Sequence, residues 1–198
     1  MGDLLCSLGM RSAALHLRYT LGEYLRFERD AHERHEFVGG LILAMAGGSL
    51  EHGALIASVT IALGAQLATR RCRVYDSNAR VRVLATGNTY YPDLSVVCGH
   101  LETDPEDPLS MANPALLVEV LSPSTAEYDR TDKLADYQRI PSLQHVVHVA
   151  HDQHRIEVWT REATGWTMAS YSDGESARLD ALGCSLAVAE LYRDPLAP

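Results

Sequence analysis

Residues 115–122 have the sequence ALLVEVLS, a continuous apolar run that is interrupted by one acid, Glu119. Such a run is typical of a central strand that is covered on both faces of its sheet. Because helical and strand-like patterns both precede and follow it, the sequence predicts an α+β (α/β-like) fold. Its core would be one mixed central β-sheet flanked by helices.

Further elements follow from hydrophobic periodicity and from turn and cap residues. Gly39-Gly40 is a two-residue turn signal, so residues 35–48 are predicted to form a β-hairpin. Ser49 can cap a mostly apolar helix over 50–69, and Ser124-x-x-Glu127 is a capping box for a helix over 125–140. The other expected elements are helices at 19–29 and 186–192, and strands at 73–84, 89–98, 143–150, 154–161 and 165–172.

Length and composition predict one globular domain. The chain has 198 residues, of which the first 18 are expected to be a poorly ordered lead-in and residues 19–198 a single domain. No apolar run reaches the length needed to span a membrane, so no membrane partner is expected. The four cysteines form no C-x-x-C pair, which favours reduced thiols in a cytoplasmic protein.

The charge of the chain is unfavourable for general nucleic-acid binding. The formal net charge is −9, whereas phosphate binding depends on cationic side chains. A local basic cluster could still follow a phosphate backbone, or its members could be solvated charges at helix ends and edge strands. The polar residues 99–114 are expected to form a long loop that is mobile or functional. The basic cluster comprises Arg70, Arg71, Arg73, Arg80 and Arg82.

Two acids lie inside apolar strands. A charged residue such as Glu119 is rarely buried unless it is paired or binds a metal. Asp93, in YYPDLSVV, enters the predicted strand 89–98. If the two strands are neighbours, both carboxylates converge at one end of the sheet and form a site suited to Mg²⁺. The alternative for Glu119 is a structural ion pair with an arginine.

Lys133 is the third candidate. It shares one face of the predicted helix 125–140 with Tyr137 and Ile140, and that face is expected to lie on the sheet. Its ammonium could therefore approach the carboxylates and stabilise charge that develops on a phosphate. The alternative is an exposed pair with Asp129, four residues before it, which would contribute little stability.

These segments resemble a known family. YPDLSVV (91–97), LLVEVLSPST (116–125) and D-x-x-x-K-L-x-x-Y (129–137), together with HEFVGGLI and AGGS-x-x-H upstream, resemble the Uma-type putative restriction endonucleases. That family belongs to the PD-(D/E)XK nuclease superfamily. The resemblance extends over about residues 19–192, and it implies a restriction-endonuclease-like domain over 19–198.

The resemblance implies roles for four residues. Asp93 matches the acid of the PD motif, Glu119 matches the acid of the E-x-K motif, and Lys133 matches the family lysine on the following helix. Glu36 matches an acid in the first hairpin and is a further candidate ligand of metal or water. Mg²⁺ or Mn²⁺ held by Asp93 and Glu119 would support hydrolysis of DNA phosphodiester bonds. A homodimer is expected, since such domains often pair to address two strands.

The sequence also departs from the superfamily pattern. Leu121 stands where the E-x-K motif has its lysine, and Gly39-Gly40-Leu41 replaces the Asp-Gly-Glu turn of many relatives. An alternative function is therefore a catalytically degenerate nuclease-fold module that binds DNA or a protein partner. A third possibility is an ordinary core, in which an arginine pairs with Glu119.

Two other patterns are weaker. Four histidines recur at every third position, but in a strand–turn–strand segment such neighbours point to opposite faces, which is unfavourable for zinc. Ser49, in AGGS, lacks the G-x-S-x-G context of a nucleophilic serine and is expected to serve as a helix cap. The histidines are His145, His148, His151 and His154.

Overall fold

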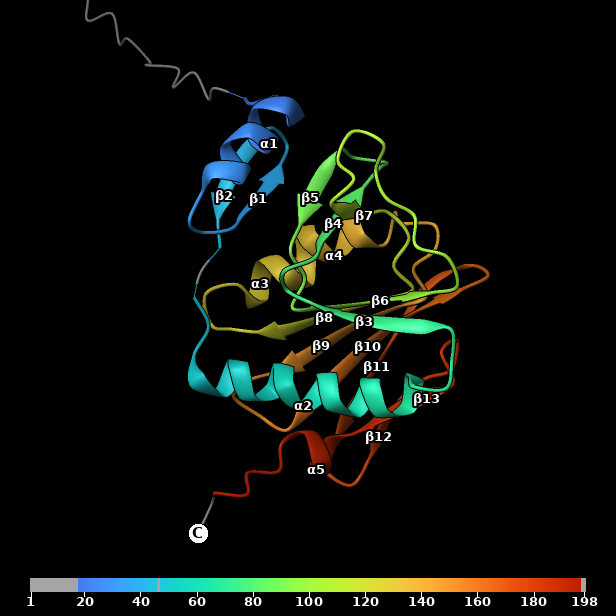
Figure 1. Ribbon diagram of the computed structural model, residues 1–198. Helices are drawn as coiled ribbons and strands as arrows, with labels where there is room; N and C mark the ends of the chain where they lie inside the picture. Colours follow the sequence, from blue (N-terminus) through green and yellow to red (C-terminus); the bar gives the residue numbers. More distant parts are fainter. Residues whose placement is uncertain (1–17, 46, 197–198) are drawn as a thin grey trace, which may run out of the picture.

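The computed structural model describes residues 18–45 and 47–196 (Figure 1). The expected lead-in at 1–18 therefore lies outside the described residues, except for Arg18. The α+β class is confirmed, with mixed sheets flanked by few helices. The strands form a six-stranded sheet, a five-stranded sheet and a two-stranded hairpin, where the sequence had predicted one central sheet.

The six-stranded sheet has the order β11-β10-β9-β8-β6-β3. The run that predicted a central strand forms β8, which pairs in parallel with β9 and antiparallel with β6. All six residues of β8 are buried, as expected for a strand covered on both faces. The strands are β3 (Cys72–Asp76), β6 (Leu94–Cys98), β8 (Leu116–Leu121), β9 (His145–Ala150), β10 (Arg155–Glu162) and β11 (Gly165–Ser172).

The five-stranded sheet has the order β2-β1-β5-β4-β7. The predicted hairpin is confirmed: Gly39 and Gly40 have φ angles of 57° and 84°, as a type I′ turn requires. The single strands predicted at 73–84 and 89–98 are wrong, because each segment breaks and contributes one strand to each sheet. The strands are β1 (His35–Val38), β2 (Leu41–Ala44), β4 (Arg80–Val83), β5 (Asn88–Tyr90) and β7 (Ser110–Met111).

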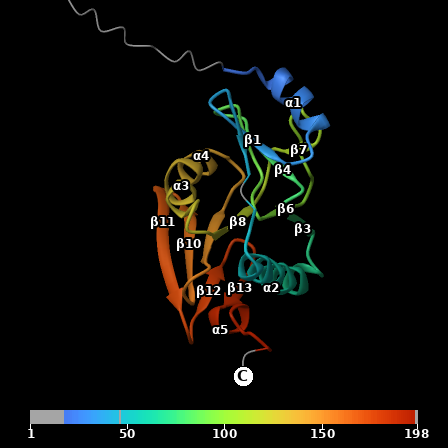
Figure 2. The same cartoon turned by 90° about the vertical axis from the view of Figure 1, so that its left-hand side faces the viewer.

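Hydrophobic side chains cover both faces of the six-stranded sheet. On one face lie α2 (Leu50–Leu67), α5 (Val188–Leu191) and the hairpin β12 (Ser176–Leu179)–β13 (Cys184–Ala187) (Figure 1). The five-stranded sheet and α4 (Leu134–Tyr137) pack on the other face (Figure 2). A remaining helix, α1 (Leu21–Asp30), lies beside β1 and carries a capping box between Thr20 and Glu23.

Helix α2 begins as predicted. The Ser49 hydroxyl accepts a hydrogen bond from the backbone N–H of His52, at 3.1 Å. By length and composition, with a mean hydropathy of 1.3, α2 could also cross a membrane. Its buried side chains belong to the core of the domain, and 22% of the helix is buried. These side chains are Leu55, Val59, Leu63 and Leu67.

The predicted helix at 125–140 has an irregular beginning. It consists of α3 (Ala126–Tyr128), a π-helical turn (Asp129–Lys133) and α4. The predicted capping box is wrong, because Thr125 is the N-cap residue and its side chain makes no cap hydrogen bond. The Ser122 hydroxyl instead lies 3.0 Å from the hydroxyls of both Ser124 and Thr125.

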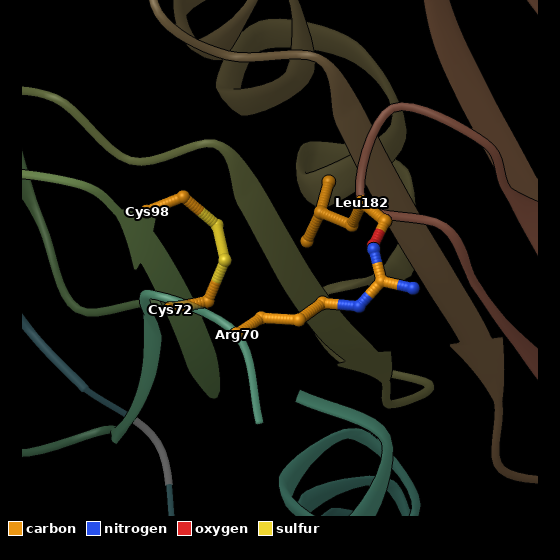
Figure 3. Close-up of a disulfide and its surroundings, with 4 residues drawn as sticks. All are labelled: Arg70, Cys72, Cys98 and Leu182. Carbon is orange, nitrogen blue, oxygen red and sulfur yellow. A yellow bond between two sulfur atoms is a disulfide. The ribbon is translucent and has the colours of Figure 1, made fainter. Parts of the chain in front are cut away.

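Arginines of the predicted basic cluster stabilise the fold. Arg80 is buried and pairs with Asp107 at 2.9 Å, and Arg82 is buried and pairs with Asp104 at 3.0 Å. Both acids belong to segment 99–114, which these ion pairs anchor and which contributes β7 to the five-stranded sheet. Arg70 donates to the carbonyl of Leu182 at 2.7 Å (Figure 3). These three arginines are therefore engaged within the protein.

The expectation of four reduced thiols is wrong. Cys72 and Cys98 lie directly opposite each other on β3 and β6 and form a disulfide (Figure 3). Strand register, which brings the two residues together, is invisible in cysteine spacing. Cys184 is a buried free thiol. Disulfides are rare in cytoplasmic proteins, so this one counts against a cytoplasmic location, which stays a prediction.

Candidate active site

The four residues singled out in the sequence line one pocket, with a volume of about 290 Å³. Glu36 comes from β1 of the five-stranded sheet, and Glu119 from β8 of the six-stranded sheet. Asp93 lies where the chain passes from one sheet to the other, and Lys133 ends the π-helical turn. The pocket is thus assembled at the junction of the two sheets.

Lys133 lies among three carboxylates. Its Nζ is 2.9 Å from Oε1 of Glu119, 3.0 Å from Oε1 of Glu36 and 3.6 Å from Oδ1 of Asp129. The residue is only 5% exposed. The alternative of an exposed pair with Asp129 is therefore wrong, although Asp129 is one of its three partners. Lys133 is also the sole lysine in the sequence, since the other 16 of the 17 basic residues are arginines.

The π-helical turn determines which side chains face the pocket. Within this turn, Asp129 and Lys133 are the two buried residues. A π turn widens the helix locally and shifts the face that later residues present, and such turns are frequent at functional sites. Helical periodicity alone predicted the inward face of Lys133 and left Asp129 as a surface residue.

Glu119 has two hydrogen-bonding partners at Oε1. The Tyr137 hydroxyl donates at 2.7 Å, on the same side as the Lys133 ammonium. The ordinary-core alternative required an arginine here, but lysine and tyrosine hold this carboxyl group. Burial raises the pKa of Glu119 to about 8; the Lys133 ammonium opposes this rise, and Asp93 and Asp129 reinforce it.

Acidic groups outnumber cationic groups in the pocket. Burial would lower the pKa of the Lys133 ammonium, but Glu119, Glu36 and Asp129 together raise it well above its ordinary value. The ammonium therefore stays charged. Together with Asp93, four carboxyl groups line the pocket, and Lys133 is the sole lysine or arginine among its described lining residues. This excess of buried acid is a chemical reason for the site to attract a further cation.

Asp93 has different partners. Its Oδ2 accepts a hydrogen bond from the backbone N–H of Val120 at 2.7 Å, and its Oδ1 lies 3.2 Å from Nε2 of His52. Leu94 is paired with Val118 across β6 and β8, so the same register extended by one residue sets Asp93 opposite Glu119. The hydrogen bond with Asp93 is the main cause that raises the pKa of His52, while burial opposes it.

Sequence analysis missed two polar residues of the pocket wall. His52 entered only as the histidine of AGGS-x-x-H, without a role, and Tyr128 was not singled out. The Tyr128 hydroxyl and Nδ1 of His52 are both buried and have no hydrogen-bond partner among residues 18–45 and 47–196. Burial raises the pKa of Tyr128 to about 12, so it remains a neutral donor and acceptor. Unpaired buried polar atoms in a pocket are available for a bound molecule.

The donor set fits a hard divalent cation. Asp93 and Glu119 offer carboxylate oxygens, which Mg²⁺ prefers, in a pocket with excess negative charge. Across the described ranges 18–45 and 47–196, no three His, Cys, Asp or Glu side chains form a ready-made metal cluster. This is compatible with Mg²⁺, which commonly uses one or two carboxylates and keeps several water ligands.

Known proteins are similar to this chain in sequence or in fold. An uncharacterized Synechocystis protein, slr1290, is 34% identical over 175 residues, covering 86% of this chain and 90% of its own. A second Synechocystis protein, sll1609, is 28% identical and covers 81% of this chain and 91% of its own. A crystal structure described as a putative nuclease of the DUF820 group, from Anabaena variabilis, has a TM-score of 0.72 at 15% identity, which shows a common fold. It covers 87% of this chain and 97% of its own.

The family assignment covers most of the chain. Residues 21–189 match the family Uma2, which is described as putative restriction endonuclease. The matched range contains Glu36, Asp93, Glu119 and Lys133, and it includes every strand of the two large sheets. The chain belongs to the Uma2 family of putative restriction endonucleases.

Proposed function

We propose that this protein is a metal-dependent endodeoxyribonuclease that hydrolyses phosphodiester bonds of DNA. The observation that carries the proposal is the buried cluster of Lys133 with Glu36, Glu119 and Asp129, in the same pocket as Asp93. A purely structural ion pair would need one acid for one lysine. The surplus carboxylates are instead suited to bind a cation and water beside a phosphate.

Asp93 and Glu119 are the proposed ligands of Mg²⁺ or Mn²⁺. When bound, such an ion lowers the pKa of water and neutralises charge on a phosphodiester. Val120 and His52 hold the two oxygens of Asp93, while Tyr137 and Lys133 hold Oε1 of Glu119. Both carboxylates are thus oriented by the protein before anything binds, which reduces the reorganisation needed during the reaction.

Lys133 is proposed to supply the function of the lysine that is missing at Leu121. Leu121 is a buried apolar residue, with 3% of its surface exposed. The cation beside Glu119 is instead supplied by Lys133, from the helical segment that follows β8. A charged ammonium at this place would donate hydrogen bonds to the attacking water or to a phosphate oxygen as negative charge develops. Glu36, 3.0 Å from the same ammonium, would orient it and could accept a proton from water.

The test is cleavage of supercoiled plasmid with Mg²⁺ or Mn²⁺. Wild-type protein should nick the plasmid only with metal, and Glu119→Gln should lower the rate at least ~100-fold, as expected when an oriented charged group is lost. Glu162→Gln is the matched control, because Glu162 is an exposed acid at the end of β10. The control should cleave like wild type.

A second measurement separates binding from chemistry. Since Lys133 is the sole lysine, protein labelled with ¹⁵N only at lysine should give a single side-chain ammonium signal by NMR. Mg²⁺ should shift this signal in wild type and not in Glu119→Gln. A metal-induced shift without cleavage of any DNA would favour the degenerate binding module. The absence of both the shift and the cleavage would refute the proposed site.

Quaternary structure and location complete the proposal. A homodimer and a cytoplasmic location, without a membrane partner, stay predictions. Size-exclusion chromatography with light scattering would test the dimer, since one chain has a mass of 21.7 kDa. A monomer that cleaves both strands would contradict the expectation that two sites are needed.

A further inference from the structure

Asp93 is held differently from the other carboxyl groups of the pocket. The ion pairs of Lys133 go to Glu36, Glu119 and Asp129. Among the side chains that the structure describes, His52 is the sole hydrogen-bond partner of Asp93, and the backbone N–H of Val120 is its other partner. The orientation of this carboxylate therefore depends on one backbone group and one imidazole.

The imidazole of His52 is held by a single side-chain hydrogen bond, the one to Asp93. Within the described part of the chain, Nε2 has a hydrogen-bond partner, whereas Nδ1 is buried without one. His52 belongs to the first turn of α2, which Ser49 caps through the backbone N–H of His52. Packing against the chain before the helix must therefore keep the ring facing Asp93.

Gly48 supplies that packing. A Cβ atom added at Gly48 would lie 2.6 Å from Cδ2 and 3.1 Å from Cγ of His52. The first distance is shorter than real Cβ contacts, so the ring would have to move. Gly48 does not have a positive φ angle, so an alanine would fit its backbone conformation. The requirement for glycine at this position comes from the imidazole ring.

We propose that His52 is a positioning residue of the active site, which orients Asp93 through Nε2, and that Gly48 is a glycine because the ring must lie against its backbone. This inference rests on the proposed function, since Asp93 is one of the proposed metal ligands. The hydrogen bond sets the direction of Oδ1, while Val120 sets that of Oδ2. Partners of this kind typically change metal affinity by ~10- to 100-fold when they are removed.

Four variants test the inference. His52→Ala removes the donor, His52→Gln keeps a donor at a similar reach, and Gly48→Ala displaces the ring without altering it. Gly64→Ala is the matched control, because an added Cβ there meets nothing within 4 Å in the same helix. Circular dichroism and thermal unfolding would first establish that each variant is folded.

The measurement is Mn²⁺ affinity, from the electron paramagnetic resonance signal of free Mn²⁺ during a titration. His52→Ala and Gly48→Ala should weaken binding at least ~10-fold, while His52→Gln stays within ~3-fold of wild type and Gly64→Ala is unchanged. Rescue by glutamine would identify the hydrogen bond, since a purely structural role of the ring would not be restored by an amide.

The outcomes separate the two proposals. If wild type binds Mn²⁺ and folded His52→Ala binds it equally tightly, the role of His52 is refuted while the proposed function stands. If glutamine is as weak as alanine, the hydrogen bond is not the cause and the inference also fails. If wild type binds no Mn²⁺ and cleaves no DNA, the proposed function fails, and the inference fails with it.

Discussion

Nζ of Lys133 lies 2.9 Å from Oε1 of Glu119, although the two residues come from different elements, a π-helical turn and the central strand β8. In the E-x-K pattern the lysine would stand at Leu121, on the same strand as the acid. Here the ammonium approaches the acid from the face of the six-stranded sheet on which α4 packs. The contact between acid and lysine is thus retained by a different path of the chain.

Replacing Lys133 should therefore lower the stability of the protein. Lys133→Met leaves three buried carboxyl groups without their cation, which should lower the free energy of unfolding by about 3–5 kcal/mol. Arg139→Met, an exposed cation beyond the same helical segment, should change it by less than about 0.5 kcal/mol. Urea denaturation measures both values. Equal stability of the two variants would show that the carboxyl groups do not need Lys133.

The disulfide should contribute measurably to stability. Cys72 and Cys98 are 26 residues apart in sequence, and closing a loop of this size typically stabilises a protein by about 2–4 kcal/mol. The double variant Cys72→Ser/Cys98→Ser should unfold at a lower temperature, and a reductant should destabilise wild type but not this variant. Thiol titration of the unfolded protein should give two more thiols after reduction. Detection of all four thiols before reduction would contradict the disulfide.

His148 should make the protein sensitive to acid. The residue is 1% exposed, and both ring nitrogens lack a hydrogen-bond partner among the residues that the structure describes. Burial lowers its pKa from 6.5 to about 4, although Glu157 opposes the shift. The unfolded chain thus binds a proton more tightly than the folded protein does. This contribution to stability is complete above pH 6.5 and is lost as the pH falls toward 4, by roughly 3 kcal/mol in total.

The variant His148→Leu isolates that contribution. Urea denaturation between pH 4 and 8 should show a smaller loss of stability in acid for the variant than for wild type. Other groups also titrate in this range, so the difference between the two proteins is the relevant quantity. Identical pH dependence of the two proteins would mean that His148 binds its proton equally well in the folded protein and in the unfolded chain.

The ion pairs of segment 99–114 give a prediction about proteolysis. Arg80→Met leaves Asp107 buried without its cation and should lower the free energy of unfolding by about 3–5 kcal/mol. It should also speed cleavage by a glutamate-specific protease at Glu102 and Glu106. Arg73→Met is the control, since Arg73 belongs to the same basic cluster but is exposed. Equal cleavage of both variants would show that Arg80 does not anchor the segment.

Sequence patterns predicted the elements whose cause is local. The apolar run of β8, the Gly39-Gly40 turn and the Ser49 cap all depend on neighbouring residues, and all are present. The patterns also selected Asp93, Glu119 and Lys133, because an acid or a lysine on an apolar face needs a partner, and the family resemblance added Glu36. The structure brings these four side chains to one pocket.

Features that depend on distant residues were not predicted. The break before Asp93 exists because the chain leaves one sheet for another, which periodicity within 89–98 does not reveal. The disulfide follows from the register of β3 with β6, and the partner of His52 follows from where α2 begins relative to that break. Arg80 and Arg82 resembled a surface cluster, since their acidic partners lie in a later segment.

The position of Lys133 between two sheets has a consequence for the exchange of backbone amide hydrogens. Its ammonium joins Glu36, in the five-stranded sheet, to Glu119, in the six-stranded sheet. The two sheets cannot separate without breaking this link, so opening of the pocket should be coupled to opening of a large part of the protein. A ligand bound there should slow amide exchange in β1 and β8 together, in elements that share no backbone hydrogen bonds.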